Sequence, residues 1–466
     1  MTPDDLALMP AHVALTEFRA RRLSPVELTT ALIDRAEADQ GRINPFTFTY
    51  FDAALDAAKR AEASYMGKGS PPRALEGLCV AIKDAGHIAG LPTSAGSLTM
   101  PDIPQPVTSP INERVLEAGG IAHARSATPE FSCATFTHSR RWGVTRNPWN
   151  PEFTPGGSSG GAAAALAAGM TSLATGSDIG GSIRIPASCC HVVGYKPPRG
   201  RTPVDVPFNL EFYCHTGPLA RTVTDTIILQ NVMCGPHPRD VTTLRPKKVI
   251  PLTHSPIAGL KIAVSMDLGF YDVDSEVVRN TNAMLDRLRD MGAEVEQITL
   301  PWDRSIETAT EAHLTHVFGT SIAPALAQPD LMTGYARRFA EDGLASDPQT
   351  YLDALYVAGR AGEAFSQAMA GFDAFICPTT ATASIAADFD PLTDSITING
   401  QRQSSFLGWV MTAPFNMLSS HPVLAVPSGW AASNLPTGMQ IVGRPYDDDM
   451  VFRIGLALEH ATGGFV

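Results

Sequence analysis

Short apolar runs alternate along this chain with longer stretches in which apolar residues recur at helical spacing. The short runs predict buried β-strands, because they are bounded by turn residues and are too short for helices. They are residues 78–82, 121–124, 172–175, 262–265, 375–377, 423–426 and 439–442. The helical stretches are residues 52–65, 112–118, 161–169 and 277–291. This alternation predicts an α/β protein with a covered, largely buried sheet.

The N-terminal part has a different pattern. Residues 24–27 (Ser-Pro-Val-Glu) form a capping box with proline at the first helical position, so a helix should begin there. Glycine, serine and proline at residues 67–72 predict a surface loop. We therefore expect an N-terminal helical layer, residues 1–66, packed on a single core domain, residues 67–466. Residues 300–400 are helical and irregular, and we expect them to cover the substrate.

Composition narrows the functional classes. The 466-residue chain has a net charge of −12, which argues against a nucleic acid or an anionic membrane as partner. Its seven cysteines are odd in number and include no Cys-x-x-Cys pair, so a disulfide framework or structural zinc site is not expected. The acidic N-terminus does not resemble a secretory signal. We expect a cytoplasmic protein that forms a homodimer.

Two serines stand in glycine-rich turns and suggest a chemistry. Residues 156–161 read Gly-Gly-Ser-Ser-Gly-Gly, and residues 178–184 read Asp-Ile-Gly-Gly-Ser-Ile-Arg. Glycines allow the backbone to approach a substrate and to point N–H groups into a site. Upstream, Lys83 follows the apolar run 78–82. A serine presented in this way, with an amine that can act as base, indicates acyl transfer.

Simpler interpretations compete with this one. A Gly-Ser run alone is typical of a flexible loop, but an alanine-rich helix and a second serine turn follow this one. The pattern Gly-x-Ser-x-Gly at residues 156–160 also matches a nucleophile elbow, which needs a strand directly before it. Residues 147–155 contain three prolines, so a central strand is not expected there. His313 and His316 lack the His-Glu-x-x-His spacing, which favours a helix surface or pocket lining over a metal site.

Six segments of the chain carry a family resemblance. They are residues 77–84, which end in Lys83-Asp84, and residues 156–161, 178–186, 193–197, 217–225 and 438–445. Together they resemble the amidase signature family. The resemblance implies a large mixed sheet wrapped by helices, and a serine hydrolase of amides that uses no metal and no cofactor.

The resemblance also assigns roles to single residues. Ser182 matches the nucleophile, Ser158 the bridging serine, which follows a cis peptide bond, and Lys83 the base. The lysine must be neutral to accept a proton, so the site has to lower its pKa from about 10.4. Other roles concern the oxyanion, the loop and the substrate. The expected oxyanion donors are the N–H groups of Ile179, Gly180, Gly181 and Ser182; Asp178 and Arg184 should hold this loop, and Ser132 and Ser158 should contact the substrate.

Two functions follow from these expectations. The first is a hydrolase of small amides or carbamates that works through an acyl-enzyme on Ser182. The alternative is the glutamine-amidase subunit of a tRNA-dependent amidotransferase. Residues 207–215 are apolar and aromatic and lack the Ser-Leu-Asp-Gln type of run seen in those subunits. This favours a stand-alone enzyme with an apolar or aromatic substrate.

Overall fold

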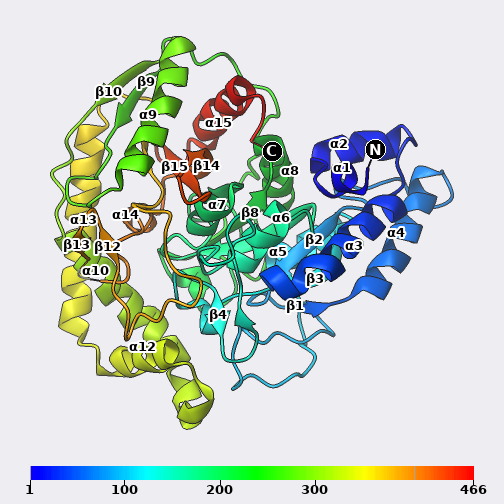
Figure 1. Ribbon diagram of the computed structural model, residues 1–466, viewed down its shortest axis with the longest axis horizontal. Helices are drawn as coiled ribbons and strands as arrows, with labels where there is room; N and C mark the ends of the chain where they lie inside the picture. Colours follow the sequence, from blue (N-terminus) through cyan, green and yellow to red (C-terminus); the bar gives the residue numbers. More distant parts are fainter. Residues whose placement is uncertain (1, 404, 466) are drawn as a thin grey trace.

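A single mixed sheet of eleven strands crosses the molecule in the computed structural model, which describes residues 2–403 and 405–465 (Figure 1). Its strands are β1 (Phe46–Thr49), β2 (Cys79–Lys83), β3 (Ile121–Ser126), β6 (Leu173–Asp178), β7 (Val193–Lys196), β8 (His215–Ala220), β9 (Lys261–Val264), β10 (Glu294–Gln297), β11 (Ala374–Pro378), β14 (Val423–Trp430) and β15 (Pro436–Gly443). The order across the sheet is β1-β3-β2-β6-β8-β7-β14-β15-β11-β9-β10. Strands β3, β2 and β6 run parallel, as do β11, β9 and β10, and the other neighbours are antiparallel. Two short hairpins lie outside the sheet: β4 (His138–Ser139) with β5 (Gly143–Val144), and β12 (Thr397–Ile398) with β13 (Gln401–Arg402).

Helices cover both faces of this sheet, and the strands bury side chains on both. The helices are α1 (Pro3–Ala7), α2 (Ala11–Arg19), α3 (Pro25–Ile43), α4 (Phe51–Tyr65), α5 (Pro110–Glu117), α6 (Gly160–Ala167), α7 (Arg184–Cys190), α8 (Val223–Met233), α9 (Ser275–Asp290), α10 (Ser305–Leu314), α11 (Thr320–Ile322), α12 (Gly334–Ala345), α13 (Pro348–Ala368), α14 (Pro414–Met417) and α15 (Asp448–Thr462). In β11, Phe375 and Cys377 belong to the apolar cluster that contains α6 and α7. Ala374 and Ile376, which alternate with these two along the strand, belong to the cluster that contains α9 and α15. Because successive strand side chains point to opposite faces, both layers are needed to bury β11. The predicted α/β fold with a large, mostly buried sheet is confirmed.

The N-terminal helices pack on one end of the sheet, at the right of Figure 1. Helix α3 begins at the predicted capping box: the Ser24 hydroxyl accepts from the N–H of Val26, and the Glu27 carboxylate accepts from the N–H of Ser24. Leu32 of α3 lies in one apolar cluster with Val80 of β2. The helical layer therefore shares its core with the sheet, and a boundary at residue 66 stays a prediction.

Residues 300–400 form a helical group at the left and lower edge of the view in Figure 1. Helix α10 packs along α13, and α12 packs on a π-helical turn, Thr315–Gly319, that continues α10. Phe318, Ser321 and Ile322 of this group line one cavity together with Lys83, and the substrate-covering role of residues 300–400 stays a prediction. Within the described part of the chain, no helix is both long and apolar enough to cross a membrane.

Candidate active site

Two neighbouring strands bring the predicted base to the edge of the sheet. Strands β2 and β6 are parallel neighbours, so their carboxyl ends meet at the same edge. Lys83 is the last residue of β2, and Ser177 is the second-last of β6. The Lys83 Nζ lies 2.9 Å from Ser177 Oγ and 2.7 Å from Ser158 Oγ. The lysine thus has two hydroxyl partners and is 3% exposed.

The surroundings of Lys83 favour its neutral form. Burial lowers the pKa of Lys83 to about 7, although Cys214 and Asp178 act in the opposite direction. Among the residues described, no carboxylate lies within ion-pairing distance of its amine. A buried amine without a counter-ion loses its proton more easily, because its charged form is poorly solvated. Lys83 can therefore accept a proton near neutral pH.

Ser158 sits in a turn that only glycine permits. The Gly157–Ser158 peptide bond is cis, as the resemblance implies. A Cβ on Gly157 would lie 2.3 Å from the carbonyl oxygen of Phe136, so no side chain fits there. Residues 154–159, which precede α6, are irregular, and this excludes the nucleophile-elbow alternative. Ser158 is buried, and its hydroxyl faces Lys83.

Ser182 lies beside the Ser158 turn. Its carbonyl oxygen accepts a 3.1 Å hydrogen bond from the N–H of Ser159, which ties the two glycine-rich turns together. Within residues 2–403 and 405–465, no hydrogen bond joins the hydroxyls of Ser158 and Ser182. Ser182 is 7% exposed, and this exposure is toward a cavity. The structure thus brings Lys83 and Ser158 into direct contact and links Ser182 to them through the backbone.

A buried ion pair holds the loop that carries Ser182. The guanidinium of Arg184 donates to both carboxylate oxygens of Asp178, at 3.0 and 2.9 Å. The same carboxylate accepts from the N–H groups of Gly181 (2.8 Å) and Ile183 (3.2 Å). Burial would raise the pKa of Asp178, but the charge and hydrogen bonds of Arg184 hold it below its ordinary value. Asp178 is therefore ionised and fixes the direction of the loop backbone.

Of the four expected oxyanion donors, one N–H group is already used within the loop and three are free in the part of the chain that the structure describes. The N–H of Gly181 already donates to Asp178, so it points away from a substrate. For the N–H groups of Ile179, Gly180 and Ser182, the described residues offer no acceptor. Gly181 instead provides backbone freedom: its φ is +124°, and a Cβ there would lie 1.9 Å from Thr412 Oγ1. Three free donors therefore remain at the turn.

Two cavities meet at these residues. The smaller, about 260 Å³, is lined by Ser182 and by Gly180 of the oxyanion loop. The larger, about 620 Å³, is lined by Lys83, Ser158 and Ser177. Ser132, Ile179 and Phe318 line both cavities. The candidate relay thus lies at the junction of two chambers.

Ser132, expected to contact the substrate, stands at this junction in an unusual backbone conformation. Its φ is +61°, and that of Phe131 before it is +53°. Its hydroxyl lies 2.8 Å from Thr128 Oγ1, and its N–H donates to the carbonyl of Pro129. The hydrogen bonds hold this turn in the left-handed region, which non-glycine residues rarely adopt.

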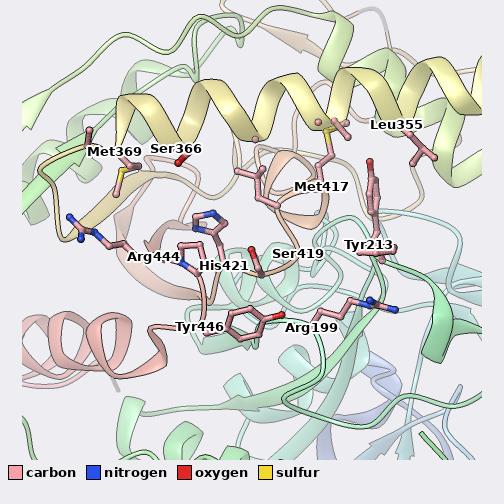
Figure 2. A pocket seen from close by; sticks show the side chains of 18 of the residues that line it. Arg199, Tyr213, Leu355, Ser366, Met369, Met417, Ser419, His421, Arg444 and Tyr446 are labelled. Atoms are coloured by element: carbon pink, nitrogen blue, oxygen red, sulfur yellow. The ribbon is translucent and has the colours of Figure 1, made fainter. Parts of the chain in front are cut away.

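A cavity of about 880 Å³, larger than either of these two, lies elsewhere, under α13 (Figure 2). Ser366 of α13 and Met369, which follows the helix, face it from one side, and Arg199 and Arg444 lie toward its opposite ends. Neither Lys83 nor either candidate catalytic serine lines it. A choice of site by cavity size alone would therefore miss the candidate catalytic residues.

Four residues at the site were not predicted. Ser177 contacts the lysine amine, Thr412 Oγ1 donates to the carbonyl of Gly180, and Asn416 and Gln440 hydrogen-bond the Arg184 guanidinium. Gln440 lies in residues 438–445, one of the six segments that carry the family resemblance, so the sequence held a signal for this residue. Thr412 and Asn416 lie in an irregular stretch around α14 that carries no motif.

His313 has a different role from the one expected. Its Nε2 lies 2.6 Å from Glu211 Oε1, and its ring stacks on Tyr213 with centroids 3.7 Å apart. It is 2% exposed, so it lies neither on the helix surface nor in one of the cavities. His316 stacks on Tyr351. Among the described residues, no three histidine, cysteine or acidic side chains gather as a metal site would need.

Comparisons with known proteins agree with this geometry. The Amidase family model matches residues 27–452. A glutamyl-tRNA(Gln) amidotransferase subunit from Gloeothece citriformis is 31% identical over 474 residues, 94% of each chain. A bacterial aryl acylamidase of the amidase signature family has a TM-score of 0.90 at 26% identity, with 97% of this chain and 96% of that one covered. The corresponding amidotransferase subunit from Thermotoga maritima has a TM-score of 0.73 at 26% identity, with 95% of each chain covered. The chain belongs to the amidase signature family.

Proposed function

We propose that this protein cleaves amide bonds of small molecules through an acyl-enzyme on Ser182, with Lys83 and Ser158 as a proton relay. The observation that carries the proposal is the 2.7 Å contact between Lys83 Nζ and Ser158 Oγ. The lysine is buried, and its pKa is lowered to about 7. A general base works best when its pKa lies near the operating pH.

The relay works in two directions. Neutral Lys83 takes the proton of Ser158, and Ser158 takes that of Ser182 as the Ser182 oxygen attacks the amide carbonyl. The carbonyl oxygen gains charge and is met by the free N–H groups of Ile179, Gly180 and Ser182. When the C–N bond breaks, Ser158 gives its proton to the leaving nitrogen and recovers one from Lys83. Water then attacks the ester by the same route and releases the acid.

The positions of the two serines orient the substrate. Ser182 lines the smaller cavity, so the acyl group bonded to it would occupy that chamber. Ser158, which protonates the leaving nitrogen, lines the larger cavity. The amine part of the substrate would therefore occupy the larger chamber, where Phe131 and Phe208 supply apolar surface. Carbamates would bind in the same way.

A second candidate function is the release of ammonia from glutamine as the amidase component of a tRNA-dependent amidotransferase. The curated relatives of this chain favour it, because they are named as subunits of that enzyme, at about 30% identity over nearly their full length. Partner subunits would then be expected. The aromatic residues at 207–215 and the higher TM-score to the aryl acylamidase favour the stand-alone amidase. Both functions use the same acyl-enzyme on Ser182.

One set of assays tests the proposal. The purified protein should react with a fluorophosphonate probe at Ser182, and mass spectrometry of the labelled peptide identifies the modified residue. Turnover should be measured on 4-nitroacetanilide, hexanamide and L-glutamine, with Ser182→Ala as the inactive control. Hydrolysis of the anilide or of hexanamide supports the stand-alone enzyme, and release of ammonia from glutamine alone supports the amidotransferase component. Labelling at a different serine would contradict both.

A further inference from the structure

One face of α10 and of the π-helical turn that follows it lines the smaller cavity. Glu311, Leu314, Thr315 and Phe318 are spaced i, i+3, i+4 and i+7, which places them on one side of a helix. The Leu314 Cδ1 lies 3.6 Å from the position of a Cβ on Gly180, so this face contacts the oxyanion loop. Glu311 stands three residues earlier, ~4.5 Å further along the helix axis. Glu311 lines the smaller cavity and is also exposed to solvent, so its carboxylate stands where this cavity opens to the surface.

Three charged side chains line this cavity, and two of them neutralise each other. The Nε of Arg338 donates to both oxygens of Asp342, at 2.9 and 2.8 Å. The carboxylate of Glu311 has neither an ion pair nor a hydrogen bond with any residue of the described chain. The remainder of the lining is mainly apolar, for example Ile185 and Phe339. The smaller cavity thus combines a mainly apolar lining with one carboxylate that has no partner among the described residues.

The neighbourhood of Glu311 attracts positive charge. Glu311 is exposed to solvent on one side; partial desolvation on the other, followed by the charges of Glu307 and Asp342, raises its pKa. Arg304 pairs with Glu307 at 3.3 Å, and Arg338 pairs with Asp342, so both nearby cations are engaged. A cation placed beside Glu311 would offset the repulsion among these carboxylates and stabilise its ionised form.

We propose that the smaller cavity selects acyl groups that carry a cationic amine, which pairs with Glu311. This inference rests on the proposed function, because it names the class of acyl group that Ser182 receives. An aliphatic chain of a few methylene groups would lie along the apolar lining of the smaller cavity, between the oxyanion loop and the Glu311 carboxylate. The substrates are then ω-amino acyl amides or related amides with a positive group at that distance from the scissile carbonyl.

The test compares two ligands that differ in charge and hardly in shape. 5-Aminopentanamide carries an ammonium group where hexanamide carries a methyl group. Binding of each is measured by calorimetry at low salt to Ser182→Ala, which cannot turn them over. We expect 5-aminopentanamide to bind about threefold to fivefold more tightly, and Glu311→Gln in the same background to remove this preference.

Glu341→Gln serves as the matched control. Glu341 lies on α12 next to Asp342, pairs with Arg337, and lines neither cavity. This variant removes the same charge and should keep the preference for 5-aminopentanamide. Equal binding of the two amides, no binding of either, or a preference that survives Glu311→Gln would overturn the inference. Binding is measured without turnover, so the two claims can fail separately. If the protein showed the binding preference but hydrolysed no amide, the proposed function would be contradicted and the inference about Glu311 would stand.

Discussion

The hydroxyl of Thr412 donates a 2.7 Å hydrogen bond to the carbonyl of Gly180 and so fastens the segment before α14 to the loop that carries Ser182. The same hydroxyl oxygen occupies the space beside Gly181. The direction of the free N–H groups in this loop therefore depends on a residue far away in the sequence. Their direction matters, because donors stabilise an oxyanion only when they are already aimed at it.

This relationship makes Gly181→Ala a severe substitution. The new methyl group would lie 1.9 Å from Thr412 Oγ1, and its φ of +124° is strained for any other residue. The loop has to move, and the donors at Gly180 and Ser182 move with it. We expect kcat/KM to fall by at least about 100-fold, the effect of losing one oxyanion donor. Steady-state kinetics on an anilide substrate measures the loss.

Gly180→Ala is the comparison for that variant. A Cβ at Gly180 meets only Leu314 Cδ1, at 3.6 Å, which is ordinary contact. We expect a clearly smaller loss than at Gly181, although both substitutions add one methyl group to the same turn. Equal losses in the two variants would show that the contact with Thr412 does not position the loop.

The pH dependence should report the ionisation of Lys83. Burial lowers the pKa of Lys83 from 10.5 to about 7, so the lysine is charged and inactive below pH 7 and neutral above it. We expect kcat/KM to rise with pH and to reach half of its plateau near pH 7. The profile is measured between about pH 5.5 and 9. Lys83→Ala should lose most of the rate and this rising limb; a wild-type profile that is flat through pH 7 would contradict the role of Lys83 as base.

Part of the sheet could be predicted from the sequence, because its strands are continuous apolar runs. Each predicted strand corresponds to an observed one, and no predicted end is more than four residues from the observed end; the strands are β2, β3, β6, β9, β11, β14 and β15. Strand β8, which lies between β6 and β7, was missed because it contains Gly217 and Pro218 and has no apolar run. Proline is rare in central strands, so the local sequence argued against it. The antiparallel pairing with β6 supplies what the local pattern lacks.

The site shows the same division between local and long-range information. The glycine turns and the lysine after a strand are local features, and they led to Lys83, Ser158 and Ser182. The residues that fix these groups come from distant segments: Thr412 and Asn416 contact the loop across more than 220 residues. Such contacts follow from the order of strands in the sheet, which no local pattern contains.

The buried pair of Asp178 and Arg184 should dominate the stability of the loop. Both side chains are fully buried, and their hydrogen bonds are 2.9 and 3.0 Å. Asp178→Asn leaves the guanidinium buried without a counter-ion, so we expect the free energy of unfolding to fall by about 3–5 kcal/mol. Urea denaturation measures this change. Asp56→Asn, which breaks an exposed pair with Lys59, should have little effect; similar changes in the two variants would contradict a structural role for the buried pair.

Ser177 should position the Lys83 amine rather than contact the substrate. Its hydroxyl lies 2.9 Å from Lys83 Nζ, on the strand next to β2, and it is one of two hydroxyls that hold the amine. Ser177→Ala leaves the amine free to turn away from Ser158, so we expect kcat to fall about tenfold with little change in KM. Ser177→Thr keeps the hydroxyl and suits a strand, and it should restore most of the rate. Steady-state kinetics separates the two parameters. If Ser177→Thr were as slow as Ser177→Ala, the hydroxyl would not be the group that orients Lys83.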